Sequence, residues 1–104
     1  MSATPKFHHV TPAAATETDL ISTLATGYDL SLQTIQIAAN TTAAVSLKFY
    51  NGSGTLAQTV PLDIDGGDTV VIDSKYVIPA GGKLAVISDQ ADTAFTAHGF
   101  LLGA

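Results

Sequence analysis

The chain has 104 residues, of which 46% are hydrophobic and 12% are charged, a composition that suits a folded domain with one hydrophobic core. Four Lys and no Arg face nine acidic residues, for a net charge of −5, and this balance argues against direct binding of nucleic acid, which depends on basic side chains. The lack of Cys excludes disulfides and thiolate chemistry. No stretch reaches the roughly 18 apolar residues of a membrane span, and none follows the signal-peptide pattern, so we expect a protein that is made in the cytoplasm and does not enter a membrane.

Residues 1–18 are predicted to form an extended N-terminal arm. They are rich in Ala, Thr and Pro, contain few large apolar side chains, and show neither helical nor strand periodicity. A disordered terminus is the alternative that the same composition allows. A regular pattern begins at Asp19, so we divide the chain into an arm, residues 1–18, and one β-sandwich domain, residues 19–104.

Two segments with clean alternation of apolar and polar side chains, residues 32–40 and 44–50, predict a β-hairpin. The apolar side chains of this alternation are Ile35, Ile37, Ala39, Val45, Leu47 and Phe49. The polar residues between the two segments are typical of a short turn.

Turn residues divide the rest of the chain into further short strands. The pairs Gly66-Gly67 and Gly81-Gly82 are interpreted as hairpin turns, and Pro61, which cannot donate to a strand ladder, predicts an edge or a break. The predicted strands are residues 19–24, 32–40, 44–50, 55–64, 69–73, 76–78, 83–88 and 94–101. We therefore expect an all-β protein, a single antiparallel β-sandwich or jelly-roll-like barrel of about eight short strands with an extended N-terminal arm.

No constellation of side chains predicts catalysis, a cofactor or a metal. His8, His9 and His98 lie at no spacing from Ser or Asp that a nucleophile motif uses, and His98 alternates with Phe95, which predicts an exposed imidazole. Residues 63–68 read Asp-Ile-Asp-Gly-Gly-Asp and resemble a calcium loop, but a Gly stands where a third oxygen ligand is needed. We expect no catalytic residue, no cofactor and no metal ion.

The succession of strands and turns from Leu32 to Leu101 carries a family resemblance. Its segments read Ile-x-Ile-x-Ala-Asn-Thr-Thr-Ala, Val-Ser-Leu-Lys-Phe-Tyr-Asn-Gly, Gly-Gly-Asp-Thr-Val-Val-Ile-Asp and Val-Ile-Pro-Ala-Gly-Gly-Lys-Leu-Ala-Val-Ile-Ser. This succession resembles small β-sandwich proteins of tailed bacteriophage particles, including capsid decoration (cement) proteins and related tail or adaptor proteins. The resemblance implies a structural protein of the virion, a homo-oligomer seated on the major capsid protein or on other virion subunits.

Five apolar side chains of the arm and of the C-terminal run are expected to contact a partner: Phe7, Val10, Phe100, Leu101 and Leu102. The chain has more apolar surface than a small isolated sandwich needs. We expect first a capsid decoration protein, whose many copies stabilise the shell. A phage tail, adaptor or fibre component is the alternative. A carbohydrate-binding or adhesion module comes third because the chain has no Trp and its Tyr residues are scattered, and an enzyme comes last.

Overall fold

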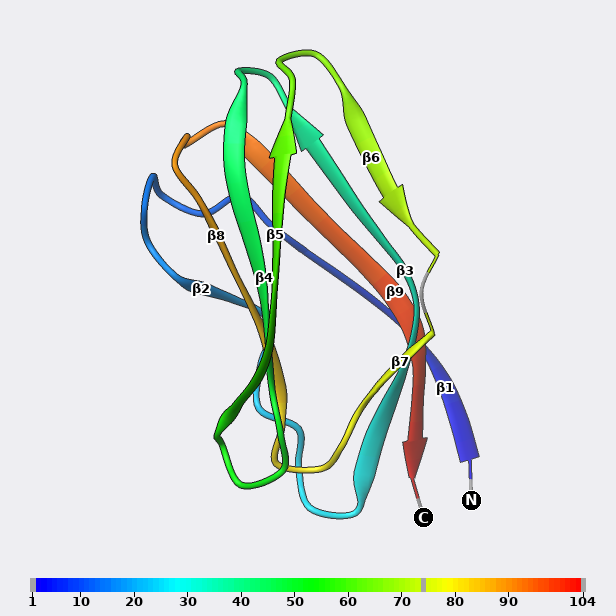
Figure 1. The fold of residues 1–104 in the computed structure, drawn as a ribbon. Coiled ribbons are helices and arrows are strands. Elements are labelled where there is room, and N and C mark those ends of the chain that lie inside the picture. Colours follow the sequence, from blue (N-terminus) through cyan, green and yellow to red (C-terminus); the bar gives the residue numbers. More distant parts are fainter. Residues whose placement is uncertain (1, 74, 104) are drawn as a thin grey trace.

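The computed structural model describes residues 2–73 and 75–103, in which every element is a β-strand (Figure 1). Met1 and Ala104, the ends of the predicted arm and domain, and Ser74 lie outside the described residues. The strands are β1 (Ser2–Val10), β2 (Thr18–Ile21), β3 (Tyr28–Ala39), β4 (Ala43–Tyr50), β5 (Leu56–Ile64), β6 (Thr69–Ile72), β7 (Tyr76–Ile78), β8 (Lys83–Ser88) and β9 (Thr93–Gly103). The predicted all-β fold is confirmed, and the eight predicted segments overlap β2 to β9 in order. The described residues contain no helix that is long and apolar enough to cross a membrane.

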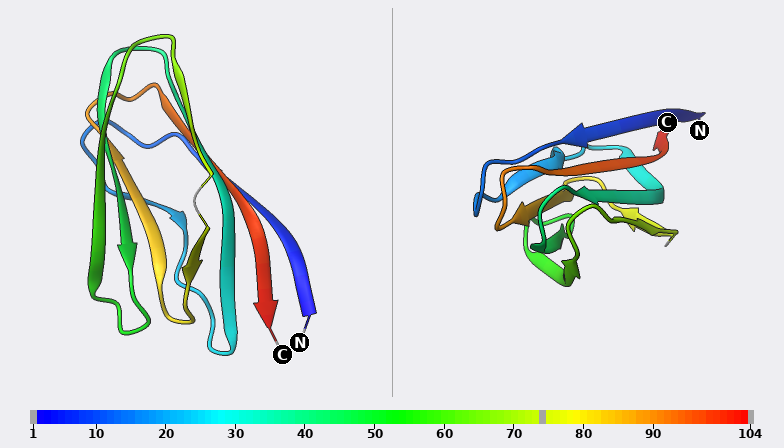
Figure 2. Two further views of the ribbon diagram at one scale, coloured as in Figure 1. Left: turned by 45° about the vertical axis from the view of Figure 1, so that its right-hand side comes forward. Right: turned by 90° about the horizontal axis from the view of Figure 1, so that it is seen from above.

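The strands form two antiparallel sheets that pack face to face as a sandwich (Figure 2). Sheet A has the order β1-β9-β3-β6, with β7 also paired to β3, and sheet B has the order β2-β8-β4-β5. The β1–β9 pair runs from Ser2 opposite Gly103 to Val10 opposite Phe95, which brings the two ends of the chain together at one end of the sandwich. The β3–β9 pair contains a β-bulge between Leu32 and Thr34.

The hydrophobic core lies between the sheets and consists of the inward-facing side chains of both. All six side chains predicted to face inward between residues 35 and 49 are buried. Phe95 and Ala97 are also buried, whereas His98, the residue that follows Ala97 in β9, is exposed, as the alternation predicted. Full burial of an aliphatic or aromatic side chain stabilises the fold by about 1.5–3 kcal/mol, so the core supplies most of the driving force.

The strands of the predicted hairpin lie in different sheets, so that prediction is wrong. β3 belongs to sheet A and β4 to sheet B, and the turn at residues 40–42 carries the chain across one end of the sandwich. Alternation shows which side chains face the core, but two strands that face one core from opposite sheets alternate in the same way as two paired strands. The turns at Gly66-Gly67 and Gly81-Gly82 also join strands of different sheets and are not hairpin turns, whereas β4 and β5 do form a hairpin.

Each sheet has edges that resist the addition of another strand. Pro61 lies in β5, the edge of sheet B, as its lack of an N–H predicted. Pro5 lies in β1, the edge of sheet A. The remaining edges are formed by β2 and β6, with four residues each, and by β7, with three. Short strands and Pro are both common protections of sheet edges against aggregation.

Nine residues of the predicted arm form β1 rather than a segment outside the sandwich. β1 pairs with β9 along its whole length, yet most of its side chains are exposed. Such a strand has no apolar period because its ladder uses backbone groups that every residue except Pro supplies. Val10 packs against the core and Pro12 is buried, so contacts with the domain continue beyond the strand.

The division of the chain at residue 18 stays a prediction, which a truncation tests. Deleting residues 1–17 is expected to leave a cooperatively folding domain whose free energy of unfolding is lower by roughly 1–2 kcal/mol, because the segment buries little apart from Val10 and Pro12. Paired thermal and urea melts of the full-length and truncated proteins measure this difference. Loss of cooperative unfolding in the truncated protein would mean that β1 is an integral part of the domain.

Candidate assembly surface

The outer face of sheet A exposes two Phe side chains from neighbouring strands. In the antiparallel register Pro5 lies opposite Phe100 and Phe7 opposite His98, so these four side chains share the face that points away from the core. Phe7 is 65% exposed and Phe100 is 42% exposed. We call Pro5, Phe7, His98 and Phe100 the β1–β9 patch.

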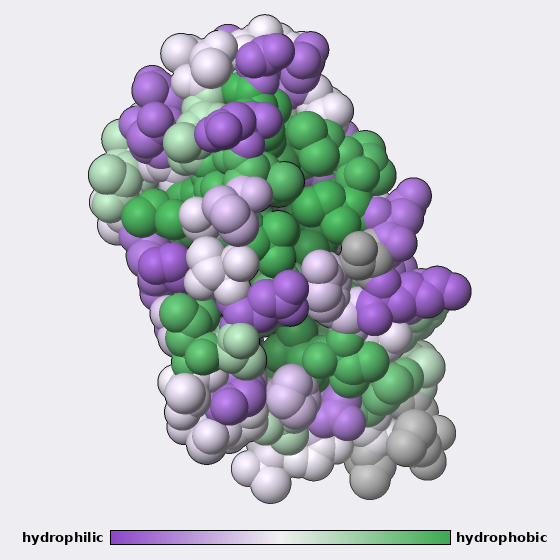
Figure 3. All heavy atoms as spheres, in the orientation of Figure 1, coloured by the Kyte–Doolittle hydropathy of each residue, from purple (hydrophilic) through white to green (hydrophobic). Residues whose placement is uncertain are grey.

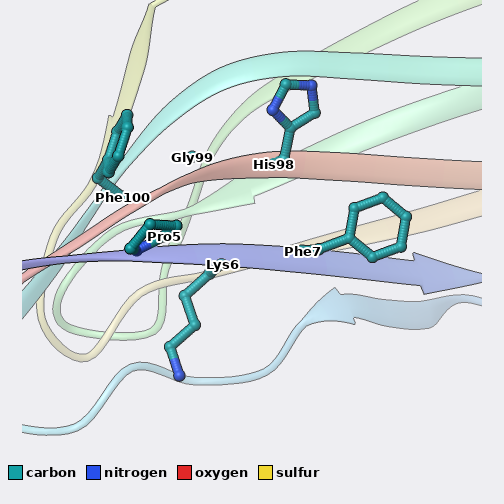
Figure 4. A pocket seen from close by; sticks show the side chains of 6 residues that line it. All are labelled: Pro5, Lys6, Phe7, His98, Gly99 and Phe100. Carbon is teal, nitrogen blue, oxygen red and sulfur yellow. The ribbon is translucent and has the colours of Figure 1, made fainter.

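The β1–β9 patch borders a shallow groove of about 500 Å³ (Figure 4). Its lining residues are Pro5, Lys6, Phe7, His98, Gly99 and Phe100. The Lys6 side chain leaves β1 on the side away from the others, so the patch itself presents two aromatic rings, a Pro ring and an imidazole. Surfaces of this composition fit protein contacts, in which aromatic side chains are enriched and charges are depleted.

The structure separates the five predicted contact residues into two groups. Phe7, Phe100 and Leu102 occupy the outer face of sheet A. Val10 and Leu101 face inward and pack against this chain's own core. The sequence analysis treated Phe100 to Leu102 as one apolar run, although neighbouring residues of a strand point to opposite faces. Contact of any of the five with a partner stays a prediction.

The opposite edge of sheet A also exposes aliphatic side chains. Val71 of β6 and Val77 of β7 are 55% and 62% exposed on the outer face. At the seam between these strands and β5, inward-facing side chains are only partly buried: Val60, Leu62, Val70, Ile72 and Tyr76. Figure 3 shows hydrophobic side chains gathered between β5 and β6 on this side of the molecule. We call these seven residues the open side.

The outer face of sheet B is polar and carries two ion pairs. Lys48 Nζ lies 3.1 Å from Glu17 Oε1, and Lys83 Nζ lies 3.1 Å from Asp19 Oδ1. The Tyr50 hydroxyl donates to Glu17 Oε2 at 2.8 Å; this bond, followed by the one from Lys48, lowers the pKa of Glu17, and it raises the pKa of Tyr50. The hydrogen bond to Asp19 raises the pKa of Lys83. The two outer faces of the sandwich therefore differ in chemistry.

His8 lies on the inner side of β1, and its titration is perturbed. Burial, followed by repulsion from Lys6, lowers the pKa of His8 from its ordinary value of 6.5. His8 is therefore neutral at pH 7, and it gains a proton only at lower pH than a free imidazole does.

Acidic side chains gather at the end of the sandwich away from the chain termini. In the turn that resembles a calcium loop, the Gly66 N–H donates to Thr42 Oγ1 at 3.0 Å, which ties the turn to the β3–β4 connection. Asp89 accepts a backbone N–H at 3.0 Å, and Asp92 accepts a Thr hydroxyl at 2.7 Å. Within the described parts of the chain, no three His or acidic side chains come close enough together to hold a metal ion.

Comparisons with known proteins show the fold. No protein family model matches the chain, and no curated protein matches it in sequence. A chain from the structure of Bacillus endospore appendages, described as disulfide-linked pili, matches with a TM-score of 0.61 at 16% identity, covering 98% of this chain and 87% of that one. A chain from the structure of the infectious bursal disease virus Gx strain matches with a TM-score of 0.51 at 12% identity, covering 97% of this chain.

Both similar structures are assemblies of protein subunits, a pilus and a virus, and at these identities the likeness concerns the fold alone. This chain spans about a third, 34%, of the virus chain, so it corresponds to one part of that protein. The chain has no Cys and so cannot form the disulfide links of the appendage pili. The likeness thus supports the β-sandwich fold that the sequence predicts.

Proposed function

We propose that this chain is a structural protein of a virus particle, most specifically a capsid decoration protein that binds and stabilises the shell. The observation that carries the proposal is the β1–β9 patch, an aromatic surface of Phe7 and Phe100 that the chain itself leaves uncovered. Monomeric soluble proteins rarely expose large apolar patches without a partner. The outer face of sheet B instead carries the ion pairs Lys48–Glu17 and Lys83–Asp19.

The fold suits this role because a sandwich of short strands gives a rigid body with two distinct faces. One face is polar and compatible with solvent, and the other presents aromatic side chains to a virion subunit. Each contact is modest, but a particle repeats it many times, so small interfaces of about 1,000 Å² add up to a stable shell. The likeness to a chain of a virus structure agrees with this proposal.

A tail, adaptor or fibre component is the second candidate. The observation that favours it is the match to the appendage pili, which covers nearly all of both chains and has the higher TM-score of the two reported. A carbohydrate-binding module is less favoured. Tyr76 stacks on Phe49 with ring centroids 4.5 Å apart, and the Tyr50 hydroxyl bonds to Glu17, so these two rings do not form an exposed platform.

Binding to shells tests the proposed function. The wild-type protein is expected to cosediment with expanded empty shells of the major capsid protein encoded near its gene. The double substitution Phe7→Ser and Phe100→Ser is expected to weaken this binding about tenfold or more, because aromatic anchors dominate such interfaces. Ile87→Ser, on the outer face of sheet B, is the matched control and is expected to bind as the wild type does.

Failure of the wild-type protein to cosediment with these shells would refute the decoration role. Cosedimentation with tails or fibres instead would establish the second candidate. Equal binding by the wild type and the double variant would show that the β1–β9 patch is not the docking surface. Melts of each variant show that folding is intact, and both substituted Phe side chains are exposed, so little loss of stability is expected.

A further inference from the structure

The strand β1 is held to the domain mainly through its backbone. It is a terminal edge strand that pairs with β9, and most of its side chains are exposed. Its contact with the hydrophobic core is made by Val10, at the end of the strand that leads into β2. A strand with so little buried apolar surface opens locally at a lower cost in free energy than unfolding of the whole domain requires.

The imidazole of His8 lies beneath this weakly held strand. His8 is opposite the buried Ala97 and on the same side of β1 as Lys6, and its side chain is half-buried. The neighbouring His9 is exposed on the outer side, where its ring centroid lies 6.0 Å from that of Phe7. Protonation of His8 therefore places a positive charge where water is partly excluded, whereas protonation of His9 leaves the charge at the surface.

The groups around His8 repel its charged form and do not neutralise it. Lys6 adds a positive charge on the inner side of β1. The segments packed against β1 are β9, β2 and the connection between β1 and β2. Their titratable side chains face the outside of the sandwich: His98, Glu17 and Asp19. The two acids are bound in ion pairs with Lys side chains of sheet B, so among the described residues of these segments none supplies a carboxylate to His8.

This environment links the closing of β1 to pH. In the closed strand, burial and then the charge of Lys6 lower the pKa of His8 from its ordinary value of 6.5, to which a released strand returns. The open form therefore binds a proton more readily than the closed form does. Well above pH 6.5 both forms are neutral, and β1 keeps its full stability. That stability falls as the pH drops from 6.5 through the lowered pKa of the closed form.

We propose that β1 is an acid-sensitive strap, a strand that protonation of His8 releases from β9. Phe7 leaves with the strap, whereas Phe100 stays in β9, so release takes the β1–β9 patch apart (Figure 4). Binding through this patch is therefore weaker in acid than at neutral pH. The effect on binding rests on the proposed function, whereas the release of β1 concerns this chain alone.

Amide hydrogen exchange at about pH 7.5 and about pH 5 measures the release. After correction for the intrinsic exchange rates, the protection of β1 amides in the wild type is expected to fall about threefold or more in acid, relative to β4 and β8. His8→Gln, which stays neutral, is expected to lose most of this fall. His9→Gln, the matched control on the outer side of the strand, is expected to keep it. Lys6→Gln is expected to reduce it, because one cause of the effect is removed.

Three results would overturn the inference. The first is protection of β1 that does not change with pH, and the second is an equal fall in the wild type and in His8→Gln. The third is an equal fall in β1, β4 and β8, because the domain would then open as a whole. Each variant is compared with itself at the two pH values, after a melt at neutral pH has verified its folding. A magnetic resonance titration of the wild type needs no substitution, and a midpoint for His8 at or above 6.5 would contradict the inference.

Shell binding at the same two pH values tests the effect on the patch. The wild type is expected to bind shells about threefold or more weakly in acid, whereas His8→Gln is expected to bind equally at both. Equal weakening of the two proteins would contradict the effect on binding. Acid release of β1 without shell binding at either pH would refute the decoration role and leave the strap standing. Shell binding without acid release would refute the strap and leave the proposed function standing.

Discussion

Replacing Phe49 with Ala is expected to lower the free energy of unfolding by about 3–5 kcal/mol. Phe49 of β4 is only 8% exposed, and its ring stacks on that of Tyr76 with centroids 4.5 Å apart and an angle of 29° between the planes. The substitution deletes most of a buried aromatic side chain, so its packing contacts are lost and a cavity remains beside Tyr76. For a domain with a total stability of about 5–15 kcal/mol, this change is a large fraction of the whole.

Urea denaturation measures the effect, with Phe7→Ala as the matched control. The control makes the same change of side chain at a site that is 65% exposed, so it is expected to alter stability by less than about 0.5 kcal/mol. A loss below about 1 kcal/mol for Phe49→Ala would show that the ring contributes little to the core. A similar loss in both variants would point to an effect on the unfolded state rather than on packing.

The core could be predicted from sequence because each central strand has one buried and one exposed face. Ile35, Ile37, Val45 and Leu47 are all buried, as their period of two predicted. Which strands pair could not be predicted, because alternation carries information about faces and not about neighbours. For this reason the segment pair β3 and β4 was interpreted as a hairpin, although the two strands belong to different sheets.

Residues on outer faces depart from the pattern where long side chains cover small ones. Ala85 alternates with the buried Leu84 and lies between Lys48 and Asp19 on the outer face of sheet B, yet it is fully buried. Lys48 forms an ion pair with Glu17, and Asp19 forms one with Lys83, and the two partners of each pair lie far apart in the sequence. Burial of a methyl group by such neighbours depends on the strand order, which the sequence alone does not reveal.

The candidate surface was predicted in part for a similar reason. Phe7 and Phe100 could be selected because they are large apolar side chains in segments with little other apolar content. Their position on one face depends on the pairing of Phe7 with His98 and of Pro5 with Phe100, across more than 90 residues of sequence. No local signal identified β1 as a strand, because its exposed side chains have no preferred face.

Replacing Gly99 with Ala is expected to destabilise the protein by about 4 kcal/mol or more. Gly99 lies in the middle of β9, and a Cβ added there would overlap the backbone carbonyl oxygen of Ser31 and lie 2.9 Å from Leu32 Cα. These are backbone atoms of β3 beside the bulge between Leu32 and Thr34, so they cannot move aside as a flexible side chain does. The methyl group would force apart β3 and β9, the central pair of sheet A.

A second Gly separates this clash from the general effect of adding a side chain. Gly54 has a φ of +79° in the β4–β5 turn, and an added Cβ would meet no atom within 4 Å. Gly54→Ala is therefore expected to lose only the roughly 1–2 kcal/mol of an unfavourable left-handed backbone. Denaturant melts of both variants, with amide hydrogen exchange across β3 and β9, measure the contrast. A loss for Gly99→Ala no greater than that for Gly54→Ala would mean that β3 and β9 can separate at little cost, and the close approach at the bulge would then have no part in holding sheet A together.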